Sequence, residues 1–541
     1  MTDFLLARGP RAVEASQEKD HHVIELGPGR GALLLHTGAG PAEHAATPDG
    51  TRIALPVTSA NHRLEVDVEH GPHGTVTVRP DPAGVPAVHY CRIGEDVLVG
   101  TDLAWLARAR ARLTGAAPSP DPEALALYLA FQYVPAPWTI WSGIRQLRAG
   151  AHLEIGPQGP PGEVPGTPLP AADGSPSEPA TDDPRVLAEI GAVCLDRVEA
   201  ALRTGLRDAG SVACLLSGGM DTSTNVAVLA RRLGIRATAY TASFEDPEFD
   251  ESRYAATVAR HFGLDHHLLR IRPADAGTVA GIAARFESPH GDRAIFAQHF
   301  LYDRVAADGH DVLVTGEGGD EIMGFPRTRD GDEELVLPAE PAALARTYLG
   351  KTCLAPAPLR AEFFRGLGVD PDLPYGVLEE CYRAQAARDP FERVHVGQWR
   401  TWMVHGVYVK DTRLARGAGL RVVLPFMDGE LMREMARVPA GRKRGGLADK
   451  AFVKAALAGV LPQETLVKKK QKFWLPFADW FRGPWHDLLH DALLGGDSWA
   501  GRTLDREVTR RLVAEHERGV DHSRLLWALL FLDLWGREAH R

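Results

Sequence analysis

The sequence predicts an α/β protein in which a β-rich N-terminal region precedes a doubly wound parallel sheet. Between residues 211 and 315, short apolar runs alternate with helical segments, which is the pattern of a parallel sheet covered by helices. Residues 1–155 instead hold short apolar runs separated by Gly and Pro turns, with a helix expected at 122–130. A Pro/Gly/Ser-rich stretch at 156–184 has the composition of a linker. We therefore expect one domain at 1–155 and a second at 185–541.

Strands are expected in the N-terminal region wherever apolar residues gather between turns. Many of these runs alternate poorly between apolar and polar residues, as in a sheet covered on both faces. The clearest runs are 22–26, 31–36, 74–79 and 96–100.

The second domain is expected to begin with a helix over 185–207. Asp182 or Asp183 supplies an N-cap for this helix, and Pro184 suits its first turn. Ligands of doubly wound sheets lie at the carboxyl ends of the strands, where Ser217 and Ser243 fall. The expected strands are 212–216, 236–242, 267–271 and 311–314, and the expected helices between them are 223–233 and 252–262.

Residues 211–224 combine a buried strand, a glycine turn and a helix start. Gly218 and Gly219 let the backbone approach a phosphate closely and turn N–H groups toward it. Thr222 and Ser223 then open a helix whose N-terminal dipole favours an anion. The alternative is an ordinary strand-to-helix turn. The expected nucleotide-binding residues are Leu216, Ser217, Gly218, Gly219, Asp221, Thr222, Ser223 and, at the next strand end, Ser243.

Acidic residues follow glycines at two strand ends. Asp221 beside a phosphate would repel it unless the carboxylate holds Mg²⁺, which bridges carboxylate and phosphate oxygens. The strand at 311–314 runs into Thr-Gly-Glu-Gly-Gly-Asp-Glu over 315–321, and this places Asp320 to share the ion. We therefore expect Mg²⁺ at Asp221 and Asp320.

Composition limits the class of protein. The chain has 541 residues, a formal net charge of −10 and a pI near 6.1, which argues against a nucleic-acid partner. Its five cysteines show no C-x-x-C spacing, so we expect reduced, mostly packed thiols and no zinc site. A signal-peptide pattern and an apolar run of membrane-spanning length are absent from the sequence. The expected location is the cytoplasm, without membrane contact.

The residues at 217–223, Ser-Gly-Gly-Met-Asp-Thr-Ser, resemble the pyrophosphate loop of ATP pyrophosphatases, with Thr222 where the usual pattern has Ser. The loop is not of the Walker type. Further stretches follow in the order of a class B asparagine synthetase domain, over roughly residues 185–530. These stretches are 250–255 with 265–267, 315–321, 424–428, 449–454 and 468–476. The resemblance implies an ATP-pyrophosphatase-type (adenine nucleotide α-hydrolase-like) domain that uses ATP and Mg²⁺.

The resemblance also implies a reaction and residue roles. A substrate carboxylate attacks the α-phosphate of ATP, pyrophosphate leaves, and an amine converts the acyl-adenylate into an amide and AMP. Lys450 matches the family's lysine at the acyl centre, although a surface lysine at a helix start is the alternative. Glu317 matches the family's acid in the second loop and is the other expected catalytic residue. Thr315, Gly316 and Lys470 complete the expected nucleotide-binding set, with a solvated charged run as the alternative for lysines 468–472.

The N-terminal region resembles, more weakly, the glutaminase domain of class B asparagine synthetases, an Ntn-hydrolase-type β-sandwich. The matching stretches are 81–90, 128–135 and 143–150. That domain takes its nucleophile from a Cys directly after the initiator Met, and here the position is Thr2. A threonine can act as a nucleophile in principle. We nevertheless expect a degenerate domain without glutaminase activity.

Two departures from the family pattern concern the substrate. At the family's motif E-x-R-x-P-F-x-D, this chain has Arg421 in place of the acid and Val423 in place of the arginine. The segment 287–294 also lacks the Thr/Ser-rich pattern that we expect for binding free aspartate. Glu317 keeps the asparagine-synthetase residue at a position where β-lactam synthetases often have Tyr. The leading hypothesis is a glutaminase-deficient amide ligase of specialised metabolism, such as antibiotic biosynthesis, related to lasso-peptide cyclases and β-lactam synthetases.

Three other hypotheses stay open at this point. An ammonia- or glutamine-dependent asparagine synthetase is supported by Glu317 and opposed by Arg421 and Val423. A non-catalytic scaffold would be expected to have degraded loops, and a tRNA-modifying pyrophosphatase fits poorly with the acidic charge. The expected partners are a small-molecule or peptide carboxylate and an amine donor. A pathway protein or a second copy of the chain is left open as a further partner.

Overall fold

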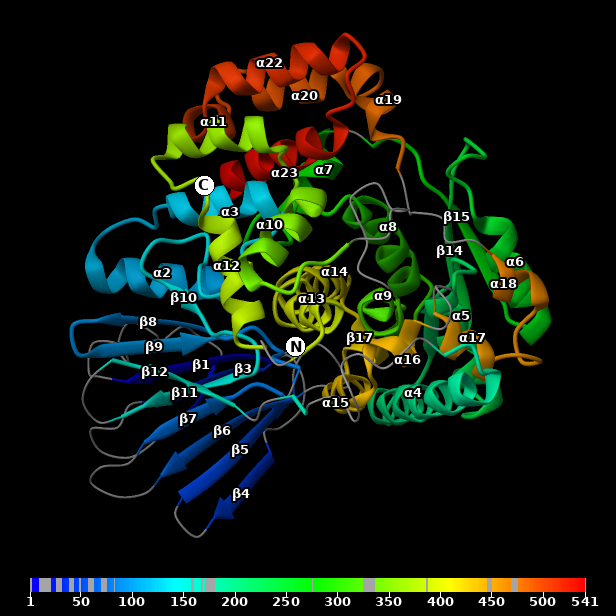
Figure 1. Ribbon diagram of the computed structural model, residues 1–541. Coiled ribbons are helices and arrows are strands. Elements are labelled where there is room, and N and C mark those ends of the chain that lie inside the picture. The colour runs from blue at the N-terminus through cyan, green and yellow to red at the C-terminus, as the bar shows by residue number, and fades with distance from the viewer. Residues whose placement is uncertain are drawn as a thin grey trace.

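The computed structural model describes the backbone of six strands between residues 2 and 69, and then most of the chain from residue 75. The described ranges from there are 75–81, 83–156, 160–166, 169–170, 181–274, 276–324, 336–385, 388–444, 450–468 and 475–540. The two antiparallel sheets of the N-terminal region lie at the lower left of Figure 1, and the parallel sheet lies at the right.

The C-terminal part is built on a five-stranded parallel sheet in the order β15-β14-β13-β16-β17. The chain first builds outward from β13 in one direction and then in the other, which is the doubly wound arrangement. Helices α4, α5 and α6 pack along one face, and α8 and α14 contact the strands as well. The strands are β13 Val212–Leu215, β14 Thr238–Ser243, β15 His266–Arg270, β16 Val312–Val314 and β17 Arg421–Val423. The helices are α4 Pro184–Gly205, α5 Met220–Arg231, α6 Ser252–Phe262, α8 Ala294–Ala307 and α14 Val409–Ala418.

This architecture confirms the predicted α/β class with a parallel sheet, and local sequence explains most boundaries. Asp183 caps α4 by accepting a hydrogen bond from the Arg185 N–H, with Pro184 in the first turn. Helix α6 has the predicted bounds and ends at Gly263 in the left-handed conformation. Helix α5 begins at Met220 and not at Ser223, because Gly219 is its N-cap. The hydroxyl residues therefore lie inside the first turn.

The N-terminal region forms two six-stranded antiparallel sheets, ordered β10-β8-β9-β1-β3-β2 and β12-β11-β7-β6-β5-β4. Figure 1 shows them stacked, and β1 contacts β5 across the two layers. The strands of the first sheet are β1 Thr2–Arg8, β2 His21–Glu25, β3 Ala32–Thr37, β8 His89–Ile93, β9 Asp96–Gly100 and β10 Arg145–Gln146. Those of the second are β4 Glu43–Thr47, β5 Gly50–Pro56, β6 Arg63–Glu69, β7 Val76–Arg79, β11 Ala151–Ile155 and β12 Gly162–Pro165.

Helix α3, Pro122–Phe131, joins the N-terminal region to the rest of the molecule. Its residues from Ala124 to Ala130 are all buried, because α11 and α12 pack against it. The Tyr128 hydroxyl donates to the Ala528 carbonyl of α23 at 2.8 Å. Helix α3 thus anchors the N-terminal sheets to the C-terminal helices. A second helix of this region, α2 Leu103–Thr114, packs against β8 and β9.

The remaining helices form a layer at the top of Figure 1 and a middle section between the sheets. An aromatic cluster of Phe296, Phe477, Trp485 and Trp527 ties the C-terminal layer to α8. The middle section contains a ten-residue π-helix, η1, over Trp399–Tyr408. The helices from residue 276 to 467 that have not yet been given are α7 Ala276–Ala283, α9 Gly319–Met323, α10 Pro341–Thr352, α11 Ala357–Leu367, α12 Leu373–Arg383, α13 Pro390–Gln398, η2 Pro425–Met427, α15 Gly429–Arg437, α16 Ala440–Arg444, α17 Ala451–Ala456 and α18 Gln463–Val467. The C-terminal helices are α19 Phe477–Arg482, α20 His486–Leu493, α21 Trp499–Thr503, α22 Arg506–Glu517 and α23 Ser523–Ala539.

The cysteines are free, as predicted, and four of the five are buried. Burial raises the pKa of the Cys91, Cys194 and Cys214 thiols to about 12, so these groups pack as small apolar side chains. Across the described residues, none of the helices combines the length and the apolar character that a membrane crossing requires.

Candidate active site

A cavity of about 930 Å³ opens at the carboxyl edge of the parallel sheet. The loops after β13 and β16 form its floor, and these neighbouring strands flank the point where the sheet reverses direction. Doubly wound sheets bind their ligands at this point. Side chains from α8, η1, α17 and α18 complete the walls.

The loop after β13 is held in shape by its own hydroxyls. Thr222 Oγ1 accepts from the Ser217 N–H at 3.1 Å, and Ser217 Oγ accepts from the Gly219 N–H at 3.3 Å. Gly218 has φ of +70° and lies so close to Tyr254 that an added Cβ would come within 2.4 Å of the Tyr254 carbonyl carbon. Gly218 is therefore required by packing against α6.

The loop after β16 fits directly against the first loop. Asn225 on α5 donates to the Thr315 carbonyl at 2.7 Å. A Cβ on Gly316 would lie 2.8 Å from a Thr222 methyl, and one on Gly319 would lie 2.5 Å from the Asp221 carboxyl carbon. The glycines of the second loop thus allow two strand ends to approach each other, and this brings Asp221 and Asp320 to the same side of the cavity.

Lys450 lies between those two aspartates. Its ammonium contacts the Asp221 carboxylate and lies 2.8 Å from Asp320 Oδ1. The residue is only 3% exposed and has a left-handed backbone, with φ of +58°, at the N-cap of α17. Such a conformation costs a non-glycine residue about 1–3 kcal/mol and is concentrated at functional sites. The surface-lysine alternative for Lys450 is therefore wrong.

A second lysine lies on the wall formed by α18. Lys468 Nζ lies 2.8 Å from Glu251 Oε1 and 4.3 Å from the centre of the Tyr254 ring. The side chain is 6% exposed. Of the predicted run 468–472, Lys468 is thus a wall residue of the cavity, while Lys470 lies outside the described residues.

Glu317 connects the cavity to a buried charge cluster. Gln298 Nε2 donates to Glu317 Oε1 at 2.6 Å, and Lys410 Nζ lies 3.1 Å from Glu317 Oε2. Lys410 Nζ also lies 3.0 Å from Asp292 Oδ2 and 4.0 Å from Asp411 Oδ2. We call Lys410, Asp292, Glu317 and Asp411 the Lys410 cluster.

The Lys410 cluster shifts the pKa values of its members in opposite directions. Burial disfavours the charged ammonium of Lys410, but Asp292, Glu317 and Asp411 outweigh it and raise the lysine pKa above its usual value. Burial likewise opposes ionisation of Asp292, yet Lys410 and His290 lower its pKa to about 2. Burial and the Glu317 charge raise the pKa of Asp411 to about 7. Lys410 and Asp292 are therefore an ion pair at neutral pH, with Asp411 near its titration point.

The π-helix η1 supplies another wall of the cavity and packs against the segment that follows β16. Trp402 donates its indole N–H to Glu321 Oε1 at 2.9 Å, and Trp399 donates to the Glu321 carbonyl at 2.8 Å. Trp402 and Val407 face the cavity. π-Helical turns are rare and occur frequently at functional sites, which fits this position.

The structure brings most of the predicted site residues to the cavity. Those in its lining are Leu216, Ser217, Gly219, Asp221, Thr222, Thr315, Gly316, Glu317, Asp320 and Lys450. Three others lie elsewhere: Gly218 packs on α6, Ser223 is fully buried inside α5, and Ser243 is not in the lining. The Ser223 N–H bonds to the Gly219 carbonyl within the helix, so its placement at the cavity was wrong.

Arg421 and Val423 also lie away from the cavity. Arg421 pairs with Asp311 at 3.3 Å, near the amino end of β16, and Val423 is buried against Gly205 of α4. Neither residue is among those that line the cavity.

The donor set of the predicted metal site fits Mg²⁺. The Asp221 and Asp320 carboxylates approach one another closely enough to contact a single ammonium group. Carboxylates supplemented by phosphate oxygens are the ligands that Mg²⁺ uses in nucleotide sites. Asp221 and Asp320 are the residues that would hold it.

The comparisons with known proteins agree with this geometry. The model of the asparagine synthase family matches residues 194–537, which is more than half of the chain. The chain belongs to the asparagine synthase family. Members of this family are ATP-dependent ligases, so the protein is assigned to an enzyme family.

Individual relatives of this family are distant. A protein of Mycobacterium bovis, named a putative glutamine-hydrolysing asparagine synthetase, is 29% identical over 445 residues, or 76% of this chain and 67% of its own length. Glutamine-hydrolysing asparagine synthetase 1 of Bacillus subtilis is 22% identical over 486 residues, or 84% of this chain and 74% of its own.

Sequence reasoning missed the wall formed by α8 and η1. Gln298, Trp402 and Val407 line the cavity, and Lys410 contacts Glu317. Lys410 and Asp411 directly follow the mostly apolar run 402–409, but Thr412 and Arg413 come next. The local sequence therefore does not distinguish Lys410 and Asp411 from an exposed charged stretch.

Proposed function

We propose that the protein forms an amide bond by activating a carboxylate with ATP. The carboxylate would attack the α-phosphate of ATP to give an acyl-adenylate and pyrophosphate. An amine would then displace AMP. The observation that carries the proposal is the convergence of Lys450 and two interlocked glycine loops on one cavity at the switch point of the sheet.

Each part of the cavity has a role in this reaction. The glycine loops offer backbone N–H groups and a helix N-terminus to the phosphates of ATP. Mg²⁺ held by Asp221 and Asp320 would neutralise charge on the leaving pyrophosphate. Lys450 stabilises the oxyanion that forms when the amine attacks, because preorganised positive charge is most effective where charge develops.

Glu317 is the proposed base for the incoming amine. Its carboxylate lies in the cavity lining, and two neighbours fix its position: Gln298 at 2.6 Å and Lys410 at 3.1 Å. A general base must be held within hydrogen-bond reach of the proton it removes. The proton of the attacking nitrogen would pass to a Glu317 carboxylate oxygen.

The substrate proposal is a specialised carboxylate and amine, as in macrolactam formation or peptide cyclisation for an antibiotic. The apolar side chains of Leu301, Trp402 and Val407 in the lining suit a substrate that has an apolar part. Asparagine synthesis is the second candidate, because both relatives carry that name and Glu317 is retained.

The N-terminal sheets are proposed to be a degenerate glutaminase-type domain. This domain extends beyond the predicted boundary at residue 155, because β12 Gly162–Pro165 lies within the predicted linker 156–184 and pairs with β11. Thr2 at the start of β1 stands where that domain type has its cysteine. The amine would then come from the substrate itself or from free ammonia. We propose a cytoplasmic enzyme that binds neither nucleic acid nor membrane and works alone, as a homo-oligomer or with a pathway protein.

The test is pyrophosphate release from ATP and Mg²⁺ with aspartate, glutamine, ammonium, or peptides that carry a free carboxylate and amine. Release with a peptide but not with aspartate supports the specialised ligase. Release that requires aspartate together with ammonium or glutamine would replace it with asparagine synthesis. Asp221→Asn, with the exposed Asp208→Asn as control, reports whether release comes from this cavity.

A further inference from the structure

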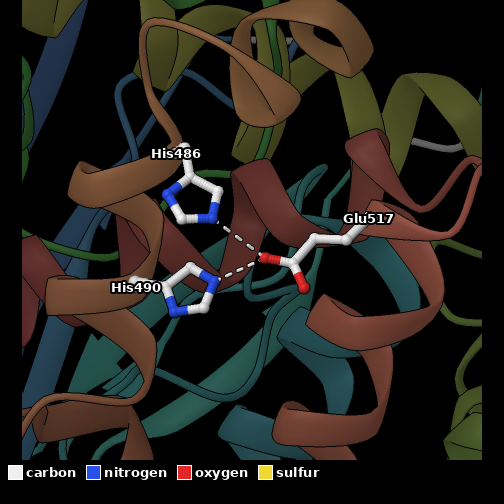
Figure 2. Close-up of side chains that lie close together, drawn as sticks. All are labelled: His486, His490 and Glu517. Atoms are coloured by element: carbon white, nitrogen blue, oxygen red, sulfur yellow. Dashed lines mark hydrogen bonds and ion pairs between the residues drawn. The ribbon is translucent and has the colours of Figure 1, made fainter.

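Three side chains of the types that bind metal ions meet on the outer face of the C-terminal helical layer. They come after α19 in the chain, whereas the cavity residue Lys468 comes before it. His486 and His490 lie one turn apart on α20, and Glu517 is the last residue of α22. Figure 2 shows both imidazole rings directed at the same carboxylate. We call these residues the His–His–Glu triad.

The contacts within the triad are short and converge on one atom. His486 Nε2 lies 3.1 Å and His490 Nε2 lies 2.6 Å from Glu517 Oε1. The two rings stack, with centroids 4.4 Å apart and an interplanar angle of 26°. The candidate ligand atoms all lie within 4.8 Å of one another. Small side-chain movements would therefore bring these atoms within bonding distance of a shared Zn²⁺ ion. The usual distance from Zn²⁺ to an imidazole nitrogen or a carboxylate oxygen is about 2.0–2.2 Å.

A fourth residue orients the first histidine. Asp487 Oδ1 lies 2.9 Å from His486 Nδ1, so this carboxylate accepts the Nδ1 proton. Metal-bound histidines usually donate their second ring nitrogen to a carboxylate in this way, which presents the Nε2 lone pair to the ion. The Nε2 lone pair of His486 then faces the Glu517 carboxylate oxygen. These two electron-rich atoms repel each other unless a cation lies between them.

We propose that the His–His–Glu triad binds Zn²⁺ and clamps α20 to α22. Two imidazoles and one carboxylate are a zinc donor set, with water completing a tetrahedron, whereas Mg²⁺ prefers oxygen ligands alone. The site is therefore chemically distinct from Asp221 and Asp320. The side chains of the three ligands are 36–44% exposed, so an ion reaches them from solvent. The proposal does not depend on the proposed function.

The cysteine pattern gave no hint of this site, because its ligands are His and Glu. The i, i+4 spacing of His486 and His490 places both rings on one face of a helix, but the third ligand comes from another helix. Only the packing of α20 against α22 brings the set together.

The test is zinc titration of the full-length protein by calorimetry, without a histidine tag and with millimolar Mg²⁺ to saturate the Asp221–Asp320 pair. The wild type is expected to bind one equivalent of Zn²⁺ that His490→Gln and Glu517→Gln both lose. His522→Gln is the matched control, because His522 pairs with Glu515 at 2.9 Å as a lone His–Glu contact. It is expected to bind as the wild type does.

Two further readouts separate metal binding from folding. Cobalt(II) in the wild type is expected to give the intense visible absorption of a tetrahedral site, and Asp487→Asn is expected to weaken zinc binding about 10–100-fold. Zinc is expected to raise the melting temperature of the wild type and of His522→Gln only. Identical zinc stoichiometry and affinity in the wild type and in both ligand variants would overturn the proposal, and so would no binding by the wild type.

Discussion

Two lysines each pair with carboxylates near the loop that follows β16, and both lysines are almost fully buried. Lys450 contacts Asp221 and Asp320, whose side chains are 21% and 41% exposed, and both of these carboxylates line the cavity. Lys410 contacts Asp292 and Glu317, whose side chains are 18% and 26% exposed, and the fully buried Asp411 lies 4.0 Å away. Of these three carboxylates, Glu317 lines the cavity, so the Lys410 cluster lies behind the lining.

The difference indicates different tasks for the same charge pattern. An ammonium at the edge of a cavity can exchange its carboxylate partners for substrate oxygens, so Lys450 is free to act in the reaction. The buried Lys410 ammonium is instead fixed by the carboxylates around it, because separating a buried charge from its partners leaves it without water. We therefore propose that Lys450 takes part in the chemistry and that Lys410 positions Glu317.

Lys410→Met is expected to lower the free energy of unfolding by about 3–5 kcal/mol, since it leaves Asp292 and Glu317 without their cation. Urea unfolding measures this, with Lys351→Met on the exposed side of α10 as a control. A loss below about 1 kcal/mol would show that the buried cluster does not depend on Lys410, and would remove the contrast between the two lysines.

Lys450→Met is expected to lower kcat by about 10²–10³-fold, the usual cost of removing one oxyanion-stabilising group. kcat/KM should fall by the same factor, because the interaction is made in the transition state. Stability should change little, since Asp221 and Asp320 are accessible to water. Activity assays and urea unfolding of Lys450→Met together test whether Lys450 acts in the reaction and not in stability. A Lys450→Met variant that is unstable but fully active per folded molecule would contradict this role.

Trp402→Phe keeps the aromatic wall but removes the indole N–H donated to Glu321 at 2.9 Å. One hydrogen bond to a charged group contributes about 1.5–3 kcal/mol at most. We expect KM for the carboxylate substrate to rise severalfold while KM for ATP stays constant. Trp138→Phe is the control, because Trp138 donates to Glu123 at 2.7 Å on the surface, away from the cavity lining. Equal changes in both KM values would argue against separate substrate and nucleotide walls.

Asp411→Asn is expected to change the pH dependence of stability. The folded protein raises the pKa of Asp411 to about 7, well above that of an exposed aspartate. Between these two values the folded state holds a proton that the unfolded state has lost, so stability falls as the pH rises. Relative to Asp411→Asn, the wild type should lose stability between about pH 4 and 7. Parallel melting curves for the two proteins over that range would contradict the assignment.

The sequence was most informative where a function is encoded by consecutive residues. The first glycine loop, the second loop and the start of α6 were located correctly, because strand, turn and helix signals lie side by side in the chain. The fold class followed from the same alternation. Ser223 was misplaced because its hydroxyl neighbours suggested a helix start, whereas Gly219 caps α5 and turns Ser223 inward.

The substrate wall could not be predicted in the same way. Gln298, Glu317 and Lys410 come from three separate elements, and their contacts exist only after α8, the loop that follows β16 and α14 have packed together. Arg421 shows the opposite error, because its place in a family motif suggested a role in the cavity while the fold puts it at the amino end of the sheet.

The most direct test of the central claim uses ¹⁸O in the carboxylate of whichever substrate supports ATP turnover. The acyl-adenylate reaction predicts AMP that carries one ¹⁸O atom and unlabelled pyrophosphate, with turnover reduced at least about 100-fold in Lys450→Met. Label in inorganic phosphate together with ADP would mean that the γ-phosphate is transferred instead. That result would contradict the assignment of the glycine loops and Lys450 to adenylate chemistry.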